Sequence, residues 1–268
     1  MASAAAPAND RSVQIGRIFS RAFGTIRSNP VATLGIALLF SAAPSMLLFY
    51  LIQTMGLETV SAVGTSATIA IGIFTVVISL LFAMITQGAL VRATVAFSEG
   101  RKSSFGESAT AGLRVAVWLL LLALLSALGI GLGLGLLIVP GVMLYIMWAV
   151  AAPALVEEGL GPIEALGRSR RLTKGARWSI FGLILILVVL YWLFSAAIGV
   201  VGVMIYGGFE GFAASSASGD LPLAYLLVNV VAGTITSAVW GVVLTSLYVE
   251  LREWKDGPKT EALAEIFG

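Results

Sequence analysis

The 268-residue sequence contains no histidine and no cysteine. These two side chains hold most zinc, haem and iron–sulfur centres, so no such centre is expected. Nucleophilic sites that depend on an imidazole base are excluded for the same reason. The sequence therefore predicts no metal, no cofactor and no catalytic residue, in a protein that is not an enzyme.

Charged residues are also scarce, at 11% of the chain against about 25% in an ordinary soluble protein. Hydrophobic residues make up 59%, and the mean hydropathy is +1.00. Six runs without Asp, Glu, Lys or Arg approach the length that crosses a ~30 Å hydrocarbon core. They cover residues 31–54, 67–91, 115–138, 141–156, 179–205 and 224–248. This pattern predicts an all-α polytopic membrane protein, with one six-helix membrane domain over residues 31–252.

The fourth run leaves an alternative open, because its 16 residues reach only ~24 Å as a helix and could form a re-entrant segment. The charges favour a crossing. With six spans, all 16 Lys and Arg residues lie on one side, whereas the other side carries only Glu58, Glu210 and Asp220. By the positive-inside rule, we expect a multi-pass protein with both termini in the cytoplasm.

The two ends of the chain flank the spans. Residues 1–10 are predicted to be a disordered tail, and residues 253–268 a cytoplasmic tail. Residues 11–29 have apolar side chains at helical spacing, with three arginines off that face. This segment is predicted to be an amphipathic helix in the membrane interface.

Small residues and prolines predict local features of the bundle. Small residues at every fourth position favour close helix contacts; they are Gly233, Ser237, Gly241 and Thr245, and the pairs Gly129 with Gly133 and Gly131 with Gly135. The glycines from 129 to 135 could be mistaken for a nucleotide-binding motif, but no strand precedes them, so nucleotide binding is not expected. Pro44 and Pro153 predict kinks, because they free the carbonyls of Phe40 and Ala149.

No acidic or basic side chain lies inside the six runs, which disfavours ion-coupled transport. The strongly polar side chains there are Gln53, Gln87 and Asn229. Such amides more often bond between helices than bind a substrate. A polar cavity around Gln87 or Asn229 would nevertheless favour transport, whereas a packed bundle would favour an accessory role.

The densest polar region is the segment from Glu157 to Gly175. Pro162 predicts the start of a helix and Gly175 its end. Arg168, Arg171 and Lys174 follow at three-residue spacing, so they are candidate contacts for an anionic lipid headgroup. The alternative is that they serve only topology and solvation, with Glu157 and Glu158 as local ion-pair partners.

Several segments resemble a known family. They are Pro153 to Trp178, the Pro140-Gly141 turn, Glu99-Gly100-Arg101-Lys102 with Phe105-Gly106-Glu107, and Leu247 to Arg252. Together they resemble the bacterial membrane domain that precedes some glycerophosphoryl diester phosphodiesterases and also occurs alone. The resemblance covers about residues 12–254 and is most specific at Ala165-Leu166, Ser169, Arg171-Leu172 and Lys174-Gly175 after Glu157. It implies a six-helix protein of a bacterial inner membrane, linked to lipid or envelope homeostasis, without the phosphodiesterase barrel of ~250 residues.

Three functions are weighed on these grounds. The first, which the sequence favours, is a non-enzymatic scaffold or accessory protein in membrane lipid or envelope homeostasis. The second is a transporter or flippase of a lipid or small amphiphile. The third is an enzyme on lipid headgroups that uses Glu157, Glu158 and Arg168. Membrane lipids, including anionic phospholipid, are the expected partners, and nucleic acid is not.

Overall fold

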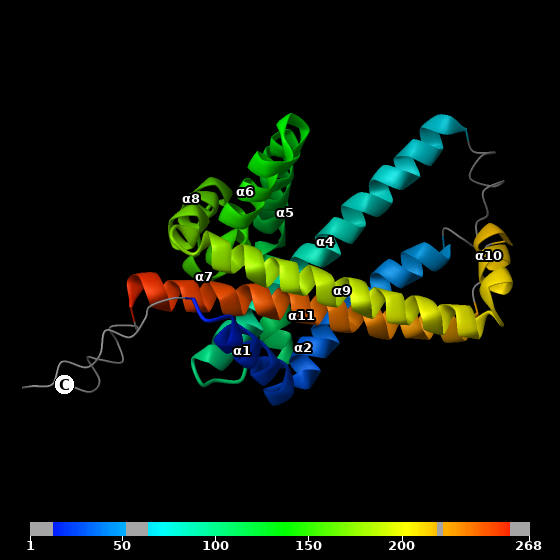
Figure 1. Cartoon of the computed structure of the whole chain (residues 1–268), viewed down its shortest axis with the longest axis horizontal. Helices are drawn as coiled ribbons and strands as arrows, with labels where there is room; N and C mark the ends of the chain where they lie inside the picture. Colours follow the sequence, from blue (N-terminus) through cyan, green and yellow to red (C-terminus); the bar gives the residue numbers. More distant parts are fainter. Residues whose placement is uncertain (1–12, 52–63, 219–221, 258–268) are drawn as a thin grey trace, which may run out of the picture.

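The computed structural model describes residues 13–51, 64–218 and 222–257. These ranges form helices and connecting turns without a strand, which confirms the all-α class (Figure 1). The elements in chain order are α1 (Ile15–Ser28), α2 (Pro30–Ala37), the π-helix η1 (Leu38–Ala42), α4 (Thr65–Ser98), α5 (Phe105–Leu136), α6 (Ile138–Trp148), α7 (Ala151–Glu158), α8 (Pro162–Thr173), α9 (Arg177–Ile205), α10 (Phe209–Ser218) and α11 (Leu223–Asp256).

Six helical segments of the described chain are long and apolar enough to cross a membrane, as predicted. They are Pro30–Leu51, Thr65–Ser98, Phe105–Leu136, Ile138–Glu158, Arg177–Ile205 and Leu223–Asp256. Three of these helices extend well beyond the predicted apolar runs, because charged residues continue α4, α5 and α11 past the apolar part. Gln53, the end of the first run and the predicted tail residues 1–10 and 258–268 lie outside the described residues.

Both prolines coincide with a break in regular α-helix. The π-helix η1 contains Phe40, four residues before Pro44. Ala149 and Val150 form a turn that separates α6 from α7, just before Pro153. These irregularities lie where a proline removes an intrahelical hydrogen bond. The helices are thus interrupted next to both prolines, whereas a kink at either position stays a prediction.

Buried hydroxyl groups of α8 satisfy the break between α6 and α7. The Ser169 hydroxyl donates to the Met147 carbonyl at 2.8 Å and accepts from the Val150 N–H at 3.3 Å. The Thr173 hydroxyl donates to the Ser169 carbonyl at 3.0 Å, within α8. As predicted, α8 begins at Pro162, and Gly175 follows its end with a φ of +92°. Because unpaired polar groups are costly inside a membrane, α8 stabilises the broken helix.

The small-residue face of α11 lies against α4 and η1. A Cβ on Gly241 would lie 2.7 Å from Leu90 Cδ1, and the Ser237 and Ser41 hydroxyls are 3.0 Å apart. Gly133 is equally crowded, since a Cβ there would lie 2.9 Å from the Cα of Gly141. These close approaches were predicted from the small-residue repeats.

The prediction for the other glycine pair of α5 was wrong. A Cβ on Gly131 or Gly135 would meet no atom within 4 Å, so neither glycine approaches another described helix. Two residues along an α-helix correspond to a rotation of about 200°, so Gly131 and Gly135 lie on nearly the opposite side of α5 from Gly129 and Gly133. The glycine repeat therefore predicted that α5 makes a close helix contact, but it did not predict which side of α5 makes that contact.

The helix predicted over residues 11–29 is α1, which packs on α11. Ile18 and Ala22 are each only 1% exposed. Arg17 pairs with Glu250 at 2.6 Å, and Arg21 pairs with Glu253 at 3.0 Å. Part of the apolar face is thus buried against the protein, which leaves Phe23, at 58% exposed, to face its surroundings. We name the end of the molecule formed by α1, α8 and the last turns of α11 the basic end.

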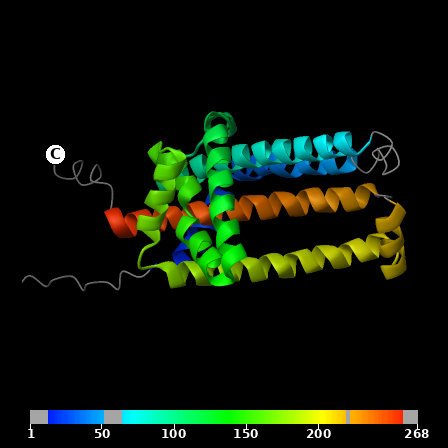
Figure 2. The ribbon, with the colours of Figure 1, turned by 90° about the horizontal axis from the view of Figure 1, so that it is seen from above.

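The helices diverge instead of forming a parallel bundle. Helices α9 and α11 run along the long axis, whereas the α5–α6 hairpin stands across it in both views (Figures 1 and 2). Helix α10 lies at the end of the molecule opposite α8. This divergence separates the wall formed by α4, α5 and α6 from the wall formed by α9 and α11, except where α4 packs on α11 at Gly241.

Candidate functional site

A cleft of about 840 Å³ lies between these two walls. Helices α4 and α5, with the junction of α6 and α7, supply one side, and α9 and α11 supply the other. Ser41 of η1 also lines it. The lining residues come from the middle parts of the apolar helices, so the cleft lies within the spans.

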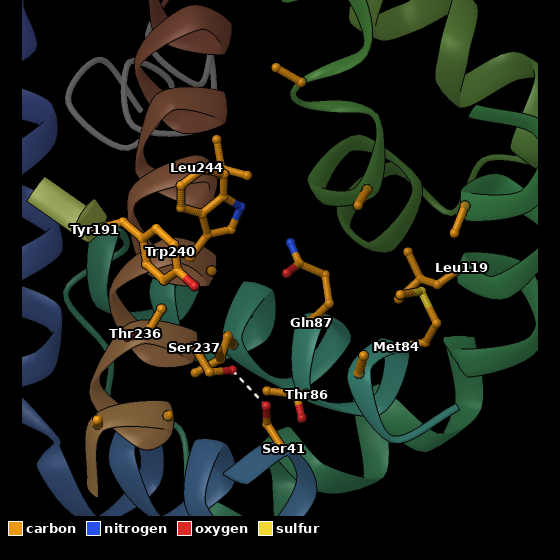
Figure 3. A pocket seen from close by; sticks show the side chains of 18 of the residues that line it. Ser41, Met84, Thr86, Gln87, Leu119, Tyr191, Thr236, Ser237, Trp240 and Leu244 are labelled. Atoms are coloured by element: carbon orange, nitrogen blue, oxygen red, sulfur yellow. Dashed lines mark hydrogen bonds between the residues drawn. The ribbon is translucent and has the colours of Figure 1, made fainter. Parts of the chain in front are cut away.

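Gln87 of α4 is the central polar group of the cleft. Its side chain extends between Trp240 and Tyr191 on one side and Met84 and Leu119 on the other (Figure 3). The amide makes no hydrogen bond to any other residue that the structure describes. An amide without a partner in apolar surroundings costs several kcal/mol. Water or the polar part of a ligand is therefore needed beside Gln87.

Other polar groups are spaced along the apolar walls. The Asn229 amide nitrogen donates to the Tyr225 carbonyl at 2.9 Å, which leaves the amide oxygen available. Tyr145, Tyr191 and Trp240 also line the cleft, and their polar atoms have no hydrogen bond within the described ranges. None of the described lining residues is Asp, Glu, Lys or Arg. An apolar cleft with a few uncharged polar groups fits an amphiphile.

The basic end contains an ion-pair network that joins α7, α8 and α11. Arg168 Nε donates to the Glu158 carboxylate at 2.8 Å, and Arg168 Nη2 pairs with Asp256. The hydroxyl of Tyr248, a fully buried residue, donates to Glu158 at 2.9 Å. The hydrogen bonds that Arg168 donates to Asp256 first, and then to Glu158, raise the pKa of Arg168 above its usual value. Arg168 is therefore a permanent cation held between two carboxylates.

The structure separates the candidate headgroup contacts. Arg168 has its two carboxylate partners, whereas the side chains of Arg171 and Lys174 are exposed. Lys174 follows the end of α8 in extended conformation. Glu158 pairs with Arg168, and Glu157 lies 4.0 Å from Arg92 of α4. Contact of the three cations with an anionic headgroup stays a prediction.

Sequence reasoning missed the partners Asp256 and Tyr248, which lie about 90 residues from Glu158 and Arg168. It also missed the role of Ser169 and Thr173, although two hydroxyl residues four apart share one helix face. Within the described ranges, no group of three or more His, Cys, Asp or Glu residues is placed to hold a metal ion.

Comparisons with known proteins give no match. A scan against models of protein families, a search of curated proteins and a search of solved structures each find nothing similar to this chain. The resemblance to the phosphodiesterase-associated membrane domain thus stays a prediction from the sequence. What the structure itself shows is a helical protein with six segments suited to cross a membrane and a cleft between them.

Proposed function

We propose that this multi-pass membrane protein binds a lipid or small amphiphile in the cleft and lets it pass between the two leaflets. The observation that carries the proposal is the Gln87 amide, which extends without a partner into a space of about 840 Å³. This volume lies within the range of ligand pockets in proteins, about 300–1,000 Å³. In a tightly packed scaffold, the amide would instead bond across a helix contact.

The lining suits a molecule with an acyl chain and a few hydrogen-bonding oxygens. Leu119, Leu122 and Met84 offer apolar contact, and Gln87 and Tyr191 offer donors. Uncharged walls offer no site for an ion that would drive uphill transport. The proposed passage is therefore uncoupled, and it involves no chemical step on the lipid.

The proposal places the protein in a bacterial inner membrane with both termini in the cytoplasm. The support for the orientation is the one-sided distribution of all 16 Lys and Arg residues, and the bacterial inner membrane follows from the family resemblance. Ion pairs among three of the predicted cytoplasmic segments agree with this arrangement, since Arg17 reaches Glu250 and Arg168 reaches Asp256. A scaffold or accessory role in lipid or envelope homeostasis is the competing function, and it requires no occupied cleft.

Gly199→Trp tests whether the cleft holds lipid. Gly199 of α9 lines the cleft, and a Cβ there would meet no atom within 4 Å, so an indole can enter the open space. We expect phospholipid retained through detergent purification, measured by mass spectrometry, to fall several-fold. Equal retention by the variant and the wild type would favour the scaffold role.

Gly131→Trp is the matched control. It is also a helical glycine whose Cβ would meet no atom within 4 Å, but it does not line the cleft. Both substitutions add the same side chain to an apolar helix. We expect Gly131→Trp to retain lipid as the wild type does, and a similar loss in both variants would contradict occupation of the cleft.

A further inference from the structure

The cleft contains hydrogen-bond donors that no described residue uses. They are the Gln87 amide of α4, the Tyr191 hydroxyl of α9 and the Trp240 indole of α11, which all line the cleft. Within the described ranges, none of these three groups is hydrogen-bonded to another residue. An indole N–H can only donate, and each of the other two groups offers at least one N–H or O–H as well. We name Gln87, Tyr191 and Trp240 the donor cluster.

The Gln87 amide has its oxygen against α11. A Cβ on Gly241 would lie 3.6 Å from Gln87 Oε1, so this oxygen packs on the α11 backbone. The amide nitrogen, on the other side of the planar group, points into the cleft, and the indole nitrogen of Trp240 faces the same open space (Figure 3). Two helices therefore direct N–H groups toward one region of the cleft.

The acceptor that Asn229 offers is too far from the donor cluster. Its amide oxygen stays available because the amide nitrogen donates to the Tyr225 carbonyl. Asn229 lies 11 residues before Trp240 on α11, which is a separation of ~16 Å along the helix axis. A donor without an acceptor is costly in apolar surroundings. An acceptor for the donor cluster therefore has to come from a bound molecule.

The surroundings of the donor cluster restrict the chemistry of that acceptor. Met84 and Leu119 face Gln87 from the opposite side of the cleft, so the acceptor oxygen must lie next to a hydrocarbon chain (Figure 3). None of the described lining residues is Lys or Arg, so no cation in the cleft balances the charge of a phosphate beside these donors. An acyl ester meets both conditions, because its carbonyl oxygen is uncharged and the carbonyl carbon is the first atom of the acyl chain.

We propose that the donor cluster binds the ester carbonyl oxygens of an acyl lipid, so that the cleft prefers ester-linked lipids to ether-linked lipids. This inference rests on the proposed function, because a lipid must occupy the cleft. An ether-linked lipid can have the same headgroup and the same chain length, but it lacks the carbonyl oxygen. The loss of one neutral hydrogen bond should weaken binding roughly three- to tenfold.

The test measures the retention of an ester lipid and an ether lipid in competition. Protein is equilibrated in mixed micelles with equal amounts of diacyl phosphatidylglycerol and its dialkyl ether analogue of the same chain length, and the retained lipids are quantified by mass spectrometry. We expect the wild type to retain the ester lipid in roughly three- to tenfold excess. Because the two lipids share headgroup and chain length, their ratio reports on the carbonyl groups.

Three substitutions remove donors from the donor cluster. Trp240→Phe and Tyr191→Phe keep an aromatic ring, and Gln87→Met keeps a side chain of similar length. Each should lower the ester-to-ether ratio several-fold toward equal retention. The Tyr191 side chain is 49% exposed, so Tyr191→Phe provides the test if Trp240→Phe or Gln87→Met does not fold.

Trp192→Phe is the matched control for Trp240→Phe. Trp192 also belongs to an apolar helix, α9, but its side chain is 72% exposed and does not line the cleft. The same substitution at this position should leave the ester-to-ether ratio unchanged. Thermal unfolding in detergent reports whether each variant is folded.

The outcomes separate the two proposals. Equal retention of ester and ether lipid by the wild type, with both lipids lost in Gly199→Trp, would overturn the ester contact and leave the cleft occupied. A ratio that stays at the wild-type value in all three donor variants, or that falls equally in Trp192→Phe, would also overturn the ester contact. Full lipid retention in Gly199→Trp would overturn the proposed function itself.

Discussion

Arg168 is the residue on which three helices converge. Its guanidinium binds the last residue of α7, Glu158, and the last residue of α11, Asp256. Only 17% of its side chain is exposed, so the pair with Glu158 is partly shielded from water. Breaking such a pair leaves carboxylates with reduced solvation, which costs more than a surface ion pair contributes.

Arg168→Gln is expected to destabilise the folded protein by about 2 kcal/mol, since hydrogen bonds to charged groups contribute 1.5–3 kcal/mol. The measurement is the thermal unfolding of detergent-solubilised protein. Arg171→Gln removes the same charge from an exposed position on the same helix and should change stability by less than about 0.5 kcal/mol. Equal effects of the two substitutions would mean that the network does not stabilise the basic end.

Among the elements, α11 is the central helix. It packs against α1, α2, η1, α4, α7, α8 and α9. Its largest buried residue, Tyr248, lies near the basic end, and its small residues lie at mid-length. Close contact at Gly241 lets Leu90 of α4 pack directly on the α11 backbone. Helix packing in a membrane depends on such close approach, because lipid tails compete equally for apolar surface.

Gly241→Leu should force α4 and α11 apart, because even a Cβ would lie 2.7 Å from Leu90 Cδ1. Overpacking of this kind typically costs about 1–3 kcal/mol. We expect a lower unfolding temperature in detergent than for Gly135→Leu, whose Cβ has open space. If the two variants unfold at the same temperature, the small-residue face of α11 does not hold the bundle together.

Local features of these elements could be predicted from the sequence, because their causes are local. Pro44 and Pro153 marked the irregular helices, since a proline removes a hydrogen bond within its own helix. The hydroxyl of Ser169, which satisfies the second break, could not be assigned because α8 had first to be placed in space. Likewise, Gly131 and Gly133 lie in one repeat, yet only Gly133 packs closely. In lipid, an apolar pattern does not distinguish a helix contact from a lipid contact.

At the scale of the molecule, the divergence of the helices creates the site. Gln87 and Asn229 stood out in the sequence as polar residues in apolar runs, but the volume between them depends on how α5, α6, α9 and α11 are arranged (Figures 1 and 2). That arrangement rests on contacts between segments far apart in the chain. The cleft, unlike the spans, was therefore beyond prediction from composition and periodicity.

The most direct test of the central claim is lipid movement in reconstituted vesicles. Vesicles carry a phospholipid with a fluorescent headgroup, and a membrane-impermeant reductant bleaches only the outer leaflet, so further loss of fluorescence reports passage of lipid from the inner leaflet. The account predicts faster loss with wild-type protein and with Gly131→Trp than in protein-free vesicles, and a several-fold slower loss with Gly199→Trp. Wild-type vesicles that lose fluorescence no faster than protein-free vesicles, or Gly199→Trp vesicles that match the wild type, would contradict passage of lipid through the cleft.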